Sequence, residues 1–360
     1  RRVSLALMQC KSDPCLYIHK EKIKKGEGVL GIGTYVDDLP CLSTSKQAYS
    51  DLIEQLKQHI PIVDLGEAKW FLSVEIKQNK NYITLNQARQ IEETYKQIKD
   101  TTSQKEWKTP MEEKLFNTQQ QYQGKILCNK DQEEYRSLIG STLYVSEWTR
   151  PDLAYAVSYL SRKLGKATST DMKHLRRLVK FMYDTRHKEL TFIKNAKCNT
   201  IVAYSDSDWG NDTLDRKSQS GYLLYIYGNL CGWKSTKQSS VALSTANAEY
   251  IALAEAAREG LYFKNLLHEF NHTQTKVNIW TDNTGAKKNA EAELQHKKSK
   301  HIDIKYHFIK DEIEKENITI GYIRTQDNPS DILTKPVSKT VYDRLCKLIF
   351  DRQIRPKGVC

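Results

Sequence analysis

The chain has 360 residues, a formal net charge of +12 and an isoelectric point near 9.1. It is longer than a single hydrophobic core usually supports, so two or three domains are expected. The eight cysteines form no C-x-x-C pair, and the sequence has no apolar run of about 18 residues. We therefore expect reduced cysteines and no signal peptide, and we do not expect a zinc-binding, secreted or membrane-spanning protein.

The first hundred residues predict two β-hairpins, each followed by a helix. Apolar runs flank the acidic pair Asp37-Asp38, so this pair is expected at the turn of the first hairpin, and residues 79–81 at the turn of the second. The predicted elements are strands at 29–35 and 39–42, a helix at 45–59, strands at 70–77 and 82–85, and a helix at 86–98.

The middle of the chain predicts a connector followed by three helices. Residues 100–131 are polar, rich in Gln and aperiodic, as is typical of a mobile linker. Helices are predicted at 135–148, 151–162 and 170–183. The basic residues of the third helix are interpreted as a solvated face in preference to a nucleic-acid contact. They are Lys173, Arg176, Arg177 and Lys180.

From residue 200 onward, three successive strands precede alternating helices and strands. This order favours a mixed sheet with helices on its faces. The predicted strands begin at 200, 221, 231, 277 and 318, and the predicted helices are 245–270, a short helix after 282, 301–316 and a final helix from Pro329.

Four carboxylates in this region lie at strand ends and helix starts: Asp206, Glu249, Asp282 and Asp331. Two unit charges at about 4 Å repel by about 4 kcal/mol at an effective dielectric constant of 20, so a cluster of carboxylates needs a cation. Oxygen ligands indicate magnesium, with manganese as the alternative. The competing interpretation is that each carboxylate caps an element, which explains one such residue well and four poorly.

The motifs around these carboxylates resemble the ribonuclease H domain of copia-class LTR-retrotransposon (Ty1/copia) Pol polyproteins. The motifs are AYSDSDWG (203–210), DRKSQSGY (215–222), GWKSTKQ (232–238), ALSTANAEYIAL (242–253), KHIDIKYHFI (300–309) and DILTKP (331–336).

The upstream motifs resemble the reverse transcriptase of the same polyproteins, so that the resemblance runs from about residue 11 to 336. They are SDPCLY (12–17), TYVDDL (34–39), DLGEAKWFL (64–72), YRSLIGSTLY (135–144) and TRPDLAY (149–155). Residues 1–9 depart from the family pattern. Pro40 departs from it as well, because proline lacks the N–H that a paired strand residue donates.

The resemblance implies a fold of the α+β or α/β class. It would contain a truncated reverse-transcriptase palm and thumb, a helical connection, and an RNase H-like mixed five-stranded sheet flanked by helices. The expected boundaries are 1–99 for the palm and the start of the thumb, 100–199 for the linker and connection, 200–345 for the RNase H-like domain and 346–360 for a tail.

By the same resemblance, Asp206, Glu249, Asp282 and Asp331 take the places of the catalytic carboxylates that hold two Mg²⁺ ions, with Mn²⁺ as the alternative. The expected reaction is hydrolysis of the RNA strand of RNA–DNA hybrids. Asp37 and Asp38 are the remnant of a polymerase metal site whose partner carboxylate and nucleotide-binding fingers would lie upstream, so polymerisation is not expected.

Lys234, Lys237 and Trp233 are weaker candidates for nucleic-acid contact, as is the lysine run 297–300. Each has a plainer interpretation, a solvated charge or a packed ring. Asp208 is not expected to bind the metal directly and would at most support the residues that do. Trp209 and Tyr250 are as readily core or edge residues as stacking ones, and His301 and His307 are interpreted as structural.

The expected partners are RNA–DNA hybrid, other nucleic acid and other polyprotein-derived chains, with no membrane. The basic charge suits a surface that follows a phosphate backbone. The expected location is inside the cell, in the cytoplasm, a virus-like particle or the nucleus. Two rival interpretations are a decayed or co-opted nucleic-acid-binding protein and a scaffold subunit for another polymerase.

Overall fold

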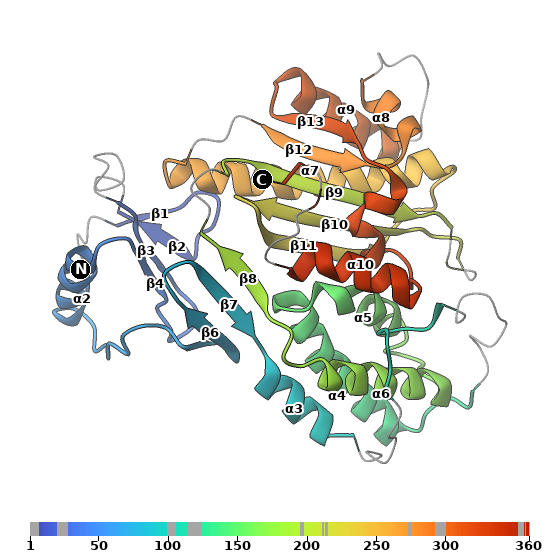
Figure 1. Ribbon diagram of the computed structural model, residues 1–360, viewed down its shortest axis with the longest axis horizontal. Coiled ribbons are helices and arrows are strands. Elements are labelled where there is room, and N and C mark those ends of the chain that lie inside the picture. Colours follow the sequence, from blue (N-terminus) through green and yellow to red (C-terminus); the bar gives the residue numbers. More distant parts are fainter. Residues whose placement is uncertain are drawn as a thin grey trace.

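The computed structural model is shown in Figure 1 and describes residues 7–19, 28–98, 106–113, 124–194, 198–210, 212, 215–272, 276–291, 300–351, 356 and 358–359. Its named strands form three sheets, two of four strands and one of five. No helix in these ranges is long and apolar enough to cross a bilayer.

The N-terminal sheet is antiparallel and contains the first predicted hairpin. Its strands, in sheet order, are β1 (Met8–Gln9), β2 (Leu16–Ile18), β3 (Leu30–Gly33) and β4 (Cys41–Ser43). Helix α2 (Lys46–Lys57) follows, and the Ser45 side chain caps it by accepting from the Ala48 N–H. The buried face of α2, which includes Leu52 and Leu56, packs on Leu30 and Ile32 of β3.

The second sheet corrects the prediction of a single strand over 70–77. That segment is broken by the turn at Leu72 and Ser73, where φ is 48° and 61°, into two antiparallel strands. The fourth strand comes from the far side of the connection and pairs with the third. The strands are β5 (Trp70–Phe71), β6 (Val74–Gln78), β7 (Tyr82–Asn86) and β8 (Leu190–Ile193).

The helical part follows the predicted order. Helix α6 begins with a capping box, in which Thr168 and Asp171 each accept from the backbone of the other. The elements are α3 (Ala88–Lys96), α4 (Asn129–Trp148), the 3-10 helix η3 (Pro151–Leu153), α5 (Ala154–Ser161) and α6 (Ser169–Asp184).

Two expectations for this part are wrong in detail. Within the predicted linker, residues 106–113 pack onto α6, and Met111 is buried in the main core. Arg177, which was assigned to a solvated face, is buried, with its guanidinium 4.4 Å from the centre of the Trp107 ring and donating to the carbonyl oxygens of Thr109 and Pro110. The linker residues 100–105 and 114–123 lie outside the described ranges.

The five-stranded sheet has the order β11-β10-β9-β12-β13. Its first three strands are antiparallel, and β9, β12 and β13 are parallel. The strands are β9 (Ile201–Asp208), β10 (Gln219–Ile226), β11 (Asn229–Lys237), β12 (Val277–Thr281) and β13 (Ile318–Tyr322).

The central strand β9 contributes to two hydrophobic cores on opposite faces of the sheet. Ile201 and Ala203 pack with α7 (Thr245–Glu269) and α9 (Lys300–Glu314), whereas Val202 and Tyr204 pack with the connection helices and α10 (Lys339–Phe350). Figure 1 shows this arrangement, with α10 and α5 on one side of the sheet and α7 on the other, while α8 (Thr284–Glu291) follows β12.

The final predicted helix is two elements. A short 3-10 helix, η5 (Pro329–Leu333), is followed after a break by α10. The boundary expected at residue 345 falls inside α10, where Leu345 and Ile349 are buried, so residues 346–350 are a packed helix and not a tail.

Among the described cysteines, one departs from the expectation. Cys198 is disulfide-bonded, contrary to the prediction of reduced thiols. The free cysteines among the described residues are Cys10, Cys15, Cys41, Cys128, Cys231 and Cys346.

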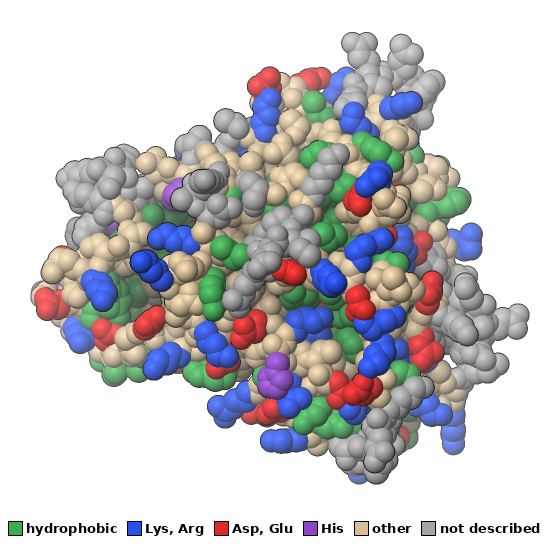
Figure 2. Space-filling model, viewed as in Figure 1, with side chains coloured by type: hydrophobic (Ala, Val, Ile, Leu, Met, Phe, Trp, Pro, Cys, Tyr) green, Lys and Arg blue, Asp and Glu red, His purple; other side chains and the backbone are tan. Residues whose placement is uncertain are grey.

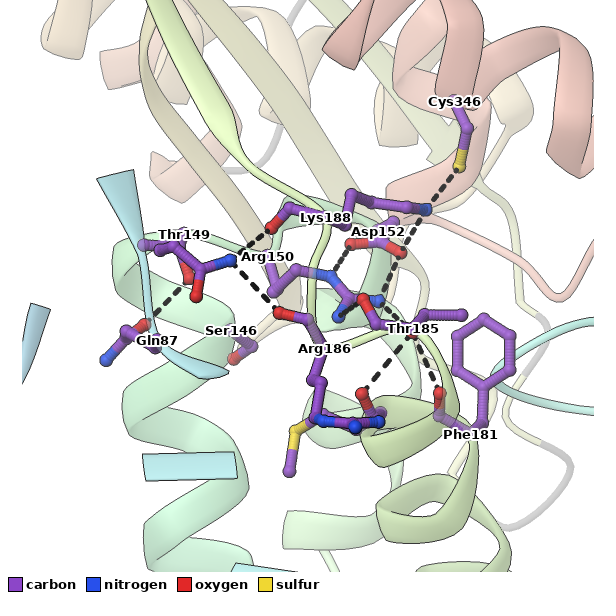
Figure 3. Close-up of polar contacts among 12 residues, drawn as sticks. Gln87, Ser146, Thr149, Arg150, Asp152, Phe181, Thr185, Arg186, Lys188 and Cys346 are labelled. Atoms are coloured by element: carbon purple, nitrogen blue, oxygen red, sulfur yellow. Dashed lines mark hydrogen bonds and ion pairs between the residues drawn. The ribbon is translucent and has the colours of Figure 1, made fainter. Parts of the chain in front are cut away.

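A buried polar network joins the connection to α10 (Figure 3). The guanidinium of Arg150 donates to both carboxylate oxygens of Asp152, at 2.8 and 2.9 Å, and to the Thr185 hydroxyl at 2.8 Å. Asp152 also accepts from Lys188 at 3.1 Å and from the Tyr342 hydroxyl at 2.6 Å. The network therefore ties η3, the end of α6, the start of β8 and α10 together.

Candidate metal centre

Three of the predicted carboxylates come together at one end of the five-stranded sheet, where β9 and β12 end. Asp206 and Glu249 are buried and Asp282 is half-buried, and one oxygen from each lies within 4.8 Å of the others. Among the described residues, this is the only group of three or more His, Cys, Asp or Glu side chains arranged in this way.

The topology explains why they meet. Strands β9 and β12 are parallel neighbours in which Tyr204 pairs with Trp280. Asp206 and Asp282, each two residues further on, therefore lie at the same end of the sheet. Glu249 lies near the start of α7, which packs across β9 and is capped by the Ser244 side chain. Two strand ends and one helix start thus supply one ligand each.

Asp331 approaches from the other flank on η5, which is fastened to the sheet by polar contacts. The Asn328 side chain donates to the Ser205 carbonyl oxygen at 3.1 Å, and the Ser235 hydroxyl donates to the Leu333 carbonyl oxygen at 2.6 Å. A Cβ at Gly221 would lie 2.7 Å from the Leu333 Cβ, so only glycine permits this approach. Asp331 is thereby held close enough to Asp206 for its charge to act on the Asp206 carboxyl group.

All four groups have a raised pKa. Burial, followed by the charge of Asp331, raises the pKa of Asp206 to about 6. Burial together with the charges of Asp206 and Asp282 raises the pKa of Glu249 well above its usual range. The pKa of Asp282 and that of Asp331 are raised mainly by burial. The site therefore disfavours its own ionisation unless a cation is present.

Two site residues were not singled out from the sequence. The Thr334 hydroxyl donates to the Asp206 carboxylate, and the Lys335 ammonium lies 3.0 Å from Oδ1 of Asp331. Both belong to the DILTKP motif, and the spacing of four residues between Asp331 and Lys335 is the signal that could have identified the lysine.

Asp37 and Asp38 lie elsewhere, in an exposed turn of the N-terminal sheet. The turn is closed by backbone hydrogen bonds between Tyr35 and Asp38, and Val36 has a φ of 51°. Pro40 precedes the edge strand β4, where a missing N–H is tolerated. In the described part of the chain, no third carboxylate, His or Cys groups with the two aspartates.

The weaker nucleic-acid candidates have different environments. The Trp233 indole N–H donates to the Ser146 carbonyl oxygen at 2.7 Å, which supports a packing role. Lys237 is paired with Asp212 and with Asp215 at 2.9 Å, while Lys234 is exposed on the edge strand β11. Residues 297–299 lie outside the described ranges.

Asp208, Tyr250 and Trp209 each have a contact or charge interaction in the structure. Asp208 ends β9, and its charge helps to raise the pKa of Lys335. Tyr250 is buried and stacks on Tyr306 with ring centres 3.7 Å apart, which is a core role. The Trp209 indole N–H donates to the Ala242 carbonyl oxygen at 2.9 Å.

Replacing Asp206 by Asn is expected to raise the thermal stability of the metal-free protein at pH 8. The pKa of Asp206 is about 6 in the fold, against about 3.9 for an unfolded aspartate. Such a group stabilises the fold while it is protonated below about pH 4, and this contribution is lost as the pH rises through 6. Asn avoids the loss, which is on the order of 1–3 kcal/mol.

Thermal melts of both proteins in EDTA at pH 8 and pH 5 measure this difference. The advantage of the Asn variant should be largest at pH 8 and smaller at pH 5. Equal melting temperatures at pH 8 would show that ionised Asp206 is not destabilising in the fold.

The chain is similar in sequence to several known proteins. A family model described as "Reverse transcriptase (RNA-dependent DNA polymerase)" matches residues 3–113. The "Retrovirus-related Pol polyprotein from transposon RE1" of Arabidopsis thaliana is 29% identical over 357 residues, covering 98% of this chain and 24% of that protein. An uncharacterised mitochondrial protein of Arabidopsis thaliana is 30% identical over 227 residues, covering 62% of this chain and 90% of that protein.

Among solved structures, LC11-RNase H1 in complex with an RNA/DNA hybrid is 18% identical with a TM-score of 0.30, covering 38% of this chain and 94% of that chain. The chain spans about a quarter of the length of the Pol polyproteins that it matches. It is matched by them over nearly its whole length, and its N-terminal part by the reverse-transcriptase model. The chain belongs to the Pol polyproteins of copia-class LTR retrotransposons.

Proposed function

We propose that this chain hydrolyses the RNA strand of RNA–DNA hybrids in a reaction that requires Mg²⁺, with Mn²⁺ as the alternative ion. The observation that carries the proposal is the meeting of Asp206, Glu249 and Asp282, whose oxygens lie within 4.8 Å of one another. Ordinary surface carboxylates would not be brought together and buried in this way, because their mutual repulsion opposes it.

The donor set fits a hard divalent cation. All its ligands are carboxylate oxygens, which magnesium and manganese prefer. Oε2 of Glu249 is buried and has no hydrogen-bond partner, so the fold leaves one acceptor of this residue for a ligand. When bound, a pair of such ions would lower the pKa of the attacking water and stabilise the leaving oxygen of the phosphodiester.

The residues of the site would have two roles, binding the metal ions and orienting the residues that bind them. Asp206, Glu249 and Asp282 would hold the ions from one side, and Asp331 would complete the set beside Asp206. The Thr334 hydroxyl donates to Asp206 and so fixes the direction of its carboxylate. Such supporting hydrogen bonds keep a ligand in the geometry that the metal needs.

Binding of the hybrid is attributed to the positive charge of the chain. The net charge is +12, and Lys and Arg side chains are spread over the face shown in Figure 2, with Asp and Glu among them. Lys234 is exposed on β11, whereas Lys237 is paired with two aspartates, so of these two lysines Lys234 is better placed for a phosphate. Such binding should weaken steeply with salt, because it releases counterions.

Polymerisation is not part of this proposal. Asp37 and Asp38 are exposed in a turn, and none of the other described carboxylates forms a metal-binding group with them. A polymerase site needs its carboxylates gathered around the ions. We therefore expect no primer extension by this chain alone.

The function is tested by incubating the purified chain with an RNA–DNA hybrid in Mg²⁺ and following the RNA strand on a gel. The proposal predicts cleavage that stops on addition of EDTA. Hybrid binding without cleavage, in either Mg²⁺ or Mn²⁺, would instead support a protein that binds nucleic acid and has lost turnover.

A further inference from the structure

We propose that Lys335 is the resident counter-cation of the acidic site, and that its ammonium group must leave Asp331 when a divalent ion binds. Lys335 would therefore set the affinity of the site for divalent cations. This inference rests on the proposed function, since it concerns the same four carboxylates, and it assigns a role to a residue outside that set of ligands.

The geometry directs the lysine toward the carboxylates. Its Nζ lies 3.0 Å from Oδ1 of Asp331, and the Asp331 side chain is only 8% exposed. Burial works against the ammonium form of Lys335, whereas the charges of Asp206, Asp331 and Asp208 favour it. The ammonium group thus lies in the field of several carboxylates while it bonds directly to one.

An ammonium group and a divalent ion compete for this position. A divalent ion bound through Asp331 would be within a few ångströms of Nζ, and like charges at such distances repel strongly in a partly buried site. The Lys335 side chain is 37% exposed and flexible, so it has room to withdraw toward solvent. Metal binding then includes the work of breaking the Lys335–Asp331 pair.

The plainer alternative is an ordinary surface ion pair between residues four apart on the chain. Lys339 and Asp343 form such a pair on α10, with both side chains about half exposed. The Lys335 pair differs because its acidic partner is buried and its charge acts on the buried carboxyl group of Asp206. The Lys339–Asp343 pair therefore supplies a control with the same spacing but no link to the site.

The test is a titration of the full chain with Mn²⁺ alone at pH 8, followed by electron paramagnetic resonance of the free ion. Four proteins are compared: wild type, Lys335→Met, Lys335→Arg and the control Lys339→Met. We expect Lys335→Met to lower the Kd for Mn²⁺ by about tenfold or more, because a positive charge beside a ligand is removed. The Lys335→Arg and Lys339→Met proteins should resemble the wild type.

Thermal melts give a second readout. A larger rise in melting temperature on addition of Mn²⁺ is expected for Lys335→Met than for the other three proteins, since a ligand stabilises the fold in proportion to its affinity. Lys335→Gln replaces Lys335→Met if the latter does not fold.

The outcomes separate this inference from the proposed function. Binding of Mn²⁺ with the same Kd by wild type and Lys335→Met overturns the role of Lys335 and leaves the metal site standing. Absence of Mn²⁺ binding by all four proteins overturns the metal site itself, and with it both proposals.

Discussion

Replacing Asp206 by Asn, or Glu249 by Gln, is expected to lower Mg²⁺-dependent cleavage of an RNA–DNA hybrid by at least about 100-fold while leaving the fold intact. Each change keeps the size of the side chain but removes one of the negative charges that hold the cations. A bound metal ion contributes several kcal/mol of charge stabilisation in the transition state, and each 1.36 kcal/mol is a factor of ten in rate.

The matched control for these variants is Asp327→Asn. Asp327 lies four residues before Asp331 but pairs with Arg324 at the surface, at 2.6 Å. The Asp327→Asn protein should cleave the hybrid at the wild-type rate. Initial rates at saturating Mg²⁺, with circular dichroism to verify folding, measure all four proteins. Wild-type rates for Asp206→Asn and Glu249→Gln would remove both residues from the catalytic site.

The largest expected effect on stability is at Asp152. Asp152→Asn is expected to lower the free energy of unfolding by about 3–5 kcal/mol, because it leaves Arg150 buried without its counter-charge. The Arg150 and Asp152 side chains are fully buried. Although burial opposes ionisation, the charges of Arg150 and Lys188 hold the pKa of Asp152 well below its usual range.

Urea denaturation of wild type and Asp152→Asn measures this effect. Asp343→Asn on α10 is the control, since its ion pair with Lys339 is exposed and such pairs contribute at most about 1 kcal/mol. A loss for Asp152→Asn no larger than that for Asp343→Asn would mean that the network shown in Figure 3 does not stabilise the fold.

The parts of the site that sequence reasoning located are those whose pattern is local. Asp206 and Asp282 follow apolar runs that become β9 and β12, and Glu249 lies near the start of the helix predicted at 245–270. Strand ends and helix starts can be recognised in a single sequence. The order of the motifs, which resembles that of a known family, indicated that the carboxylates belong to one site. The mixed sheet was predicted for the same reason.

The missed features depend on contacts that a local pattern does not contain. The break at Leu72 and Ser73 needs two non-glycine residues with positive φ inside an apolar run, so the run is expected to be one strand. The buried Arg177 donates to the carbonyl oxygens of Thr109 and Pro110, which are more than sixty positions away along the chain. A basic residue on a helix is usually solvated, so only the fold reveals its partner.

Lys335 and Thr334 were overlooked for a different reason. A lysine four residues after an aspartate is common and usually marks a surface pair. Its importance follows only from the burial of Asp331 and from the closeness of Asp331 to Asp206, which depend on how η5 docks on the sheet. Gly221, which permits that docking, lies in a strand more than a hundred residues earlier.

The central claim is most directly tested by cleavage of a hybrid whose RNA and DNA strands carry different labels, with wild type and Asp206→Asn assayed side by side over a range of Mg²⁺ concentrations. We expect that wild type cuts the RNA strand alone, that cutting rises with Mg²⁺ and stops with EDTA, and that Asp206→Asn leaves both strands intact. Cutting of both strands, or equal cutting by the two proteins, would contradict it.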